Sequence, residues 1–138
     1  MSKPILEDNH YCFVCGEKNP LGLKLQFHHP EKGLLRSEVT FKPEHQGYRG
    51  IVHGGLVATV LDEMMVNLAW IEQTPAVTAE LTTRILKPVP VGEPVALEGR
   101  LEKGGEKILY MQAVARSFSG EILAQAQASC IRIRQGVD

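Results

Sequence analysis

One stretch of this chain is long and apolar enough to form a buried helix, and it starts at a pair of glycines. It reads HGGLVATVLDEMM from His53, and its apolar residues recur three, four and seven positions apart up to about Ile71. We therefore expect a helix from Gly54 to about Ile71. The first N–H groups of a helix have no partner within it, and the helix dipole favours negative charge there. Because glycine lets a ligand approach closely, this helix start could bind a carbonyl oxygen that becomes an oxyanion.

Asp62 lies about two turns further along, on a helix face of its own. The residues that share this face are small or apolar, namely Gly55, Ala58, Met65, Val66 and Ala69. A carboxylate in such surroundings is expected to be partly desolvated, as catalytic carboxylates often are. Glu63 falls instead on a more polar face and is expected to be solvated and dispensable. The alternative for Asp62 is a solvated or capping side chain.

Composition indicates an ordinary globular protein. The chain has 138 residues, of which 43% are hydrophobic and 22% charged, and its formal net charge is −1. This charge gives no support for binding to nucleic acid or to anionic membranes. No stretch approaches the roughly 20 apolar residues of a membrane span, and the N-terminus lacks the apolar run of a signal peptide. We therefore expect a cytoplasmic protein without nucleic-acid or membrane partners.

Three cysteines are too few for a disulfide framework. Cys12 and Cys15 form a C-x-x-C pair, and Cys130 lies alone in an apolar strand pattern. A structural zinc ion takes four ligands, and although His28 is spaced from Cys15 as in a zinc finger, the adjacent His29 is not spaced as a second histidine. A redox site would need a strand–helix setting that the pattern does not show. We expect a structural turn without metal or other cofactor, with a zinc site as the alternative.

The remaining pattern predicts strands on both sides of the helix. Residues 1–22 read as an irregular lead-in that contains the C-x-x-C pair, and residues 23–138 as a single domain. Alternating apolar residues and turn signals predict strands over residues 23–28, 35–41, 77–86, 94–101, 108–118 and 122–134. A strongly curved antiparallel sheet wrapped around the one long helix would bury it, which makes the fold α+β. Such a sheet leaves a hydrogen-bonding edge, which proteins often pair with another subunit.

The segment from Gly47 to Asp62, GYRGIVHGGLVATVLD, resembles the hot-dog-fold acyl-CoA thioesterases of the phenylacetyl-CoA thioesterase (PaaI-like) type. The residues CFVCG from Cys12 and NPLGL from Asn19 are similar to the lead-in of one branch of that family. The pattern of elements fits from about Cys12 to Arg134. The resemblance implies a curved antiparallel sheet around a central helix, dimers that often pair into tetramers, and an active site at the subunit interface.

The resemblance also implies roles for individual residues. It assigns the catalytic carboxylate to Asp62, as nucleophile or as general base for water, and the oxyanion site to the backbone of Gly54 and Gly55. His53 would lie beside the thioester, and Thr78 could orient water from the partner subunit. The alternatives are that His53 only caps the loop and that Thr78 is an ordinary β-branched strand residue.

Further residues are expected to bind the substrate. Some relatives carry an asparagine six residues before the histidine of the His-Gly-Gly motif, where this chain has Gly47, so His45 or Gln46 could take its place. Arg84 and Lys87 could contact the phosphates of CoA, although charged residues at strand ends are usually solvated.

These features together predict hydrolysis of an acyl-CoA thioester to a free carboxylic acid and CoA, with no metal among the site residues. Two other functions stay open. A dehydratase of the same fold would need a different pairing of histidine and acid across subunits. A non-catalytic acyl-CoA sensor would usually carry an attached DNA-binding or partner domain. The identity of the acyl group does not follow from the sequence.

Overall fold

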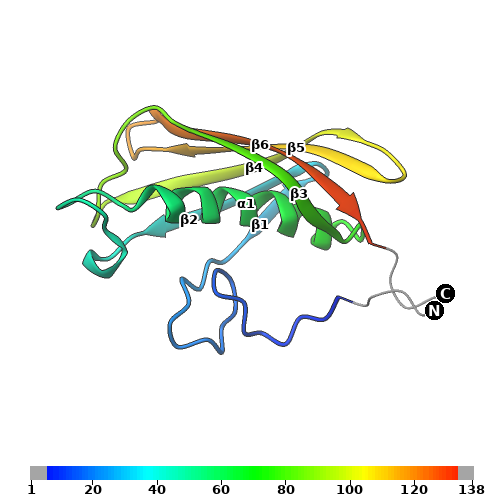
Figure 1. Ribbon diagram of the computed structural model, residues 1–138, viewed down its shortest axis with the longest axis horizontal. Coiled ribbons are helices and arrows are strands. Elements are labelled where there is room, and N and C mark those ends of the chain that lie inside the picture. The colour runs from blue at the N-terminus through cyan, green and yellow to red at the C-terminus, as the bar shows by residue number, and fades with distance from the viewer. Residues whose placement is uncertain (1–5, 134–138) are drawn as a thin grey trace.

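The computed structural model describes residues 6–133, and in this range a six-stranded antiparallel sheet packs on one long helix (Figure 1). Two strands precede the helix, β1 (His28–Glu31) and β2 (Leu34–Thr40). A short 3-10 helix, η1 (Pro43–His45), lies in the loop that leads to the helix α1 (Gly54–Ile71). Four strands follow, namely β3 (Ala76–Ile85), β4 (Pro94–Gly104), β5 (Ile108–Arg116) and β6 (Ile122–Arg132).

The strands are ordered β1-β2-β4-β5-β6-β3 across the sheet. The strand that follows the helix in sequence therefore lies at one edge and pairs with β6. Within the described range, the other side of β3 has no strand partner. The sheet curves around α1, as Figure 1 shows, so the predicted α+β hot-dog architecture is confirmed.

Helix α1 is buried against this sheet. Its buried residues lie mostly on the apolar stripe that the sequence predicts, and they are Val57, Val60, Leu61, Met64, Met65, Leu68 and Ala69. Inward-facing residues of β4, β5 and β6 complete the core. On β6 these are small, with Ala124, Ala126 and Ala128 all buried, which leaves room for the helix close to the sheet.

Gly99 on β4 marks a close approach between strand and helix. A Cβ atom at this position would lie 2.6 Å from the backbone oxygen of Met64, which is closer than real Cβ contacts come. Because the obstructing atom belongs to the helix backbone, a side chain here cannot be accommodated by a rotamer change. The absence of a side chain at Gly99 therefore permits the observed packing.

We expect Gly99→Ala to lower the free energy of unfolding by about 2 kcal/mol, because the added methyl group forces α1 away from β4. Gly104→Ala is the matched control on the same strand, since its Cβ atom would meet only ordinary contacts of 3.7 and 3.9 Å. The control should change the free energy by no more than about 1 kcal/mol. Urea denaturation measures both values, and equal values for the two variants would contradict the close approach.

The strand predicted over residues 23–28 is wrong, because only His28 belongs to β1. The N–H groups of Leu23 and Leu25 donate instead to carbonyl oxygens of the lead-in, and Lys24 has a positive φ of 56° that interrupts an extended strand. Leu25 is buried in the core. The alternation in this segment thus reflects packing with the lead-in. The other predicted strands lie within a few residues of those observed, and residue 134, the predicted end of the last strand, lies outside the described residues.

By length and composition, helix α1 is apolar enough to cross a membrane, which the sequence analysis did not predict. Its mean hydropathy is 1.3 over the 18 residues Gly54–Ile71. A buried helix in the core of a globular domain can have the same length and composition. In this fold the apolar residues of α1 pack against the sheet.

Candidate functional site

His53 caps the start of α1. Its ring Nδ1 accepts a hydrogen bond from the backbone N–H of Gly55 at 3.0 Å. Because Nδ1 accepts this bond, the neutral ring carries its proton on Nε2. The N–H of Gly55 is therefore occupied, whereas the N–H of Gly54 has no partner among residues 6–133. Of the two glycines predicted to hold an oxyanion, Gly54 is the one with an available donor.

A mostly apolar hollow of about 480 Å³ opens beside this helix start. Gly47, His53 and Gly54 line it, together with Tyr48 from the preceding loop and Ile85 from the end of β3. Its volume lies within the range of small-molecule pockets. The sequence analysis did not include Tyr48 and Ile85, because only the fold brings the end of β3 to the helix start.

Asp62 and Thr78 form a second polar group, further along α1. The Thr78 hydroxyl donates to Oδ1 of Asp62 at 2.5 Å, and both side chains are half-buried. Thr78 lies near the start of β3, just before an irregularity in the pairing with β6. The structure thus brings together two residues predicted for the site. The hydrogen bond that joins them forms within one chain.

Cys130 lies next to this pair and was not predicted there. It is opposite Thr78 in the ladder between β3 and β6, and it is completely buried. Burial raises the pKa of the Cys130 thiol, and the negative charge of Asp62 raises it as well. Only the strand register places this cysteine beside the carboxylate, so its position in the sequence gave no signal.

The helix start and Asp62 are too far apart to act on one atom within a single chain. Asp62 follows Gly54 by eight residues, which corresponds to about 12 Å along the helix axis. A reacting carbonyl group needs its oxyanion donor and its attacking group at roughly 3 Å each. A second copy of the chain is one way to bring a helix start to Asp62.

Two of the predicted substrate-binding residues shape the loop before α1. The ring Nδ1 of His45 accepts the backbone N–H of Lys42 at 2.9 Å. The side-chain oxygen of Gln46 accepts the backbone N–H of Gly50 at 3.0 Å. Both acceptor atoms are thus used within the loop. Gly47, which follows these two residues in the sequence, lines the hollow.

Arg84 and Lys87 do not line the hollow at the helix start. Arg84 lines a different depression, together with Gln125 and Gln127 of β6. Lys87 forms an exposed ion pair with Glu121 at 2.7 Å. Gly47, His53 and Gly54 therefore line one hollow, and the two basic residues are not part of its lining.

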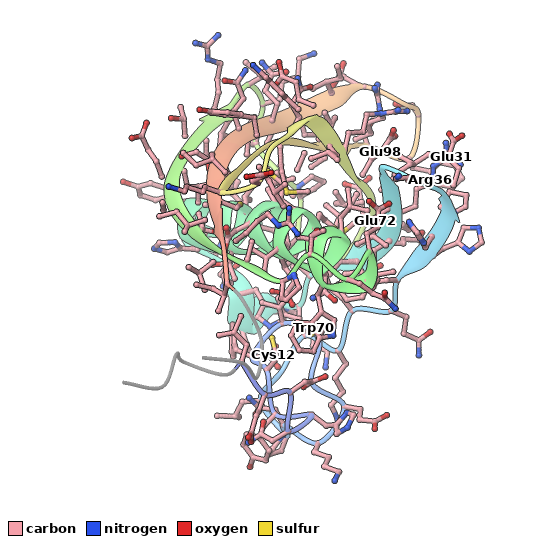
Figure 2. The ribbon with its side chains drawn as sticks, turned by 90° about the vertical axis from the view of Figure 1, so that its right-hand side faces the viewer. Cys12, Glu31, Arg36, Trp70, Glu72 and Glu98 are labelled. Carbon is pink, nitrogen blue, oxygen red and sulfur yellow. The ribbon has the colours of Figure 1, made fainter. Side chains whose placement is uncertain are left out.

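Glu63 is half-buried, so the expectation that it is solvated is wrong. Its Oε1 accepts hydrogen bonds from Asn67 at 2.7 Å and from the Cys12 thiol at 3.5 Å. The lead-in covers this face of α1, and Figure 2 shows Cys12 and Trp70 on the side of the helix away from the sheet. Burial raises the pKa of the Cys15 thiol, and the hydrogen bond and charge of Glu63 raise it further.

The charge of Asp62 near Cys130 predicts the effect of one substitution. Asp62→Asn should lower the pKa of the Cys130 thiol, because it removes a nearby negative charge. Thr82→Val, on the exposed part of β3, is the control and should leave this pKa unchanged. The measurement is a pH titration of the isotope-labelled Cβ of Cys130, and an unchanged or higher pKa in Asp62→Asn would refute the arrangement.

Comparisons with known proteins point to one family. A model of the thioesterase superfamily matches residues 49–124, which include the helix start, Asp62 and Thr78. Acyl-coenzyme A thioesterase 13 of Mus musculus is 25% identical over 101 residues, which is 71% of each protein.

Solved structures share the fold. A crystal structure of a thioesterase superfamily protein has a TM-score of 0.82 and 27% identity, and the match covers 87% of this chain but only 62% of that longer chain. A hypothetical thioesterase from Streptococcus pneumoniae TIGR4, solved with coenzyme A, has a TM-score of 0.76 and 16% identity over 82% of this chain and 88% of that one. The E. coli PaaI protein from the phenylacetic acid degradation operon has a TM-score of 0.75 and 14% identity, with 80% and 84% covered.

Proposed function

The chain belongs to the thioesterase superfamily, and we propose that it hydrolyses an acyl-CoA thioester to a free carboxylic acid and CoA. The observation that carries this proposal is the half-buried Asp62 carboxylate held by Thr78, on the same helix whose start offers the N–H of Gly54. The name of the mouse relative and the coenzyme A in the streptococcal structure support a CoA ester as the substrate.

The chemistry follows from these groups. The thioester oxygen accepts a hydrogen bond from the N–H of Gly54, which stabilises the negative charge that develops during attack. His53 lines the same hollow as Gly54, and in this proposal the proton on its Nε2 donates to the same oxygen. The mostly apolar hollow beside the two residues holds part of the acyl-CoA.

Asp62 has two possible roles in this reaction. As a general base it takes a proton from water, whose oxygen bonds to the carbonyl carbon. The bond between carbon and sulfur then breaks, and the CoA sulfur takes the proton from Asp62. As a nucleophile the carboxylate itself attacks, CoA leaves, and water hydrolyses the resulting anhydride. In both cases the Thr78 hydroxyl orients the carboxylate through Oδ1.

The active site in this proposal is shared between two copies of the chain, because about 12 Å separates Gly54 from Asp62 along one helix. One copy supplies Asp62 and the other supplies the helix start. The free edge of β3 offers a place for the two copies to meet, since it carries the exposed apolar residues Val77, Leu81 and Ile85. We propose a dimer at least, which further pairing would make a tetramer.

Variants of the streptococcal protein support the choice of residues. Two further structures of that protein carry an aspartate or a threonine replaced by alanine, at positions sixteen residues apart. Asp62 and Thr78 have the same separation in this chain. This equal spacing favours them as the matching pair.

We expect Asp62→Asn to lower turnover by about a hundredfold or more, because the amide is neither a base nor a nucleophile. Glu38→Gln, which changes an exposed carboxylate on β2, is the control and should stay within about twofold of the parent protein. Turnover is measured as thiol release from short-chain, medium-chain, long-chain and aryl acyl-CoAs. Binding of these esters by the parent protein without thiol release would favour a sensor over an enzyme.

A mixing experiment tests the shared site. Gly55→Val should cripple turnover, because its Cβ would lie 3.2 Å from Nδ1 of His53 and displace the ring. When this variant is unfolded and refolded together with Asp62→Asn, half of the dimers are mixed, and each mixed dimer regains one complete site. Turnover should then recover to about a quarter of the parent value. No recovery in mixed dimers confirmed by mass would show that each chain builds its own site.

A further inference from the structure

Two cysteines of the lead-in and one glutamate of α1 meet on the helix face opposite the sheet. The Sγ atoms of Cys12 and Cys15 and a carboxylate oxygen of Glu63 all lie within 4.8 Å of one another. The sequence analysis did not include Glu63 as a ligand for the C-x-x-C pair, because Glu63 follows Cys12 by 51 positions. We propose that these three residues bind a zinc ion, which fastens the lead-in to α1.

The spacing of the three ligand atoms suits zinc. Zinc holds thiolate sulfur at about 2.3 Å and carboxylate oxygen at about 2.0–2.2 Å in tetrahedral geometry, so two such ligands of one ion lie about 3.5 Å apart. Sγ of Cys12 is 3.5 Å from Oε1 of Glu63. Small movements of Cys15 would complete the third corner, and all three side chains are half-buried.

Hydrogen-bond donors surround these ligand atoms. The backbone N–H groups of Val14 and Cys15 point to Sγ of Cys12 at 3.3 and 3.5 Å. The side-chain amide of Asn67 donates to Oε1 of Glu63 at 2.7 Å and to Sγ of Cys15 at 3.7 Å. Donors of this kind stabilise thiolate and carboxylate ions, and they typically orient the ligands of protein metal sites.

The charges around the cluster also favour a cation. In residues 6–133, no lysine, arginine or histidine forms an ion pair with Glu63. A cavity of about 230 Å³ adjoins the cluster, and the acidic residues Glu7 and Asp8 are among its lining. Water or one of these carboxylates can fill the fourth position of the ion. Two thiolates among the ligands select zinc over magnesium or calcium.

The proposed ion would have a structural role. Residues 6–27 form no helix or strand, and the lead-in is held to the core by buried side chains such as Val14 and by hydrogen bonds to Leu23 and Leu25. A metal that joins Cys12 and Cys15 to Glu63 cross-links this segment to the central helix. Zinc binding would therefore stabilise the folded chain in proportion to the logarithm of its concentration. This role is independent of the proposed thioester hydrolysis.

The test uses the full reduced chain, freed of metal and titrated with zinc or cobalt. We expect one ion per chain, a higher melting temperature with zinc, and with cobalt the thiolate charge-transfer band and strong visible bands of a tetrahedral sulfur site. Cys12→Ser, Cys15→Ser and Glu63→Gln should each weaken cobalt binding by about a hundredfold or more. Cys130→Ala is the matched thiol control and should bind as the parent does, because Cys130 lies on β6 and is not part of the cluster.

Three results would overturn the proposal. The first is that the reduced parent chain binds no stoichiometric zinc or cobalt. The second is that Glu63→Gln binds cobalt with the affinity of the parent chain. The third is a disulfide between Cys12 and Cys15 in freshly purified protein, found by counting free thiols. If a variant does not fold, as judged by circular dichroism, the cobalt spectrum of the parent chain decides, since a spectrum without the thiolate band excludes the site.

Discussion

Burial of α1 against the curved sheet is the interaction on which the rest of the molecule depends. The helix buries seven side chains, and Gly99 lets β4 approach the helix backbone at Met64. Because the sheet curves around a single helix, β3 at its edge reaches the flank of α1 and brings Thr78 to Asp62. The geometry of this pair thus follows from tertiary packing, as does most helix stability in proteins.

The same helix separates two kinds of chemistry that belong to neighbouring residues. Successive residues on a helix point about 100° apart, so Asp62 faces β3 while Glu63 faces the lead-in. A carboxylate–hydroxyl pair suited to thioester hydrolysis and a cluster of sulfur and oxygen atoms suited to a metal are therefore adjacent in sequence but do not touch. A substitution in one of these two groups therefore removes no direct contact of the other.

The sequence predicted the central helix from its local periodicity and its glycine motif. It placed α1 at Gly54–Ile71, and the superfamily match and the fold confirm the resemblance to PaaI-like hot-dog thioesterases. It could not predict contacts between distant segments. Lys24 leaves the extended conformation because its neighbours bond to the lead-in, Glu63 is covered by that same lead-in, and Cys130 reaches Asp62 only through the register of β3 with β6.

The free edge of β3 has a consequence for how the protein folds. Within the described range this strand pairs only with β6, which comes last in the element order, so its pairing depends on a contact between segments far apart in sequence and is expected to form slowly. Until another strand covers it, the edge presents unpaired backbone groups and a row of apolar side chains to every other newly made chain. Correct pairing then competes with aggregation, so the yield of refolding should pass through an optimum as the protein concentration rises.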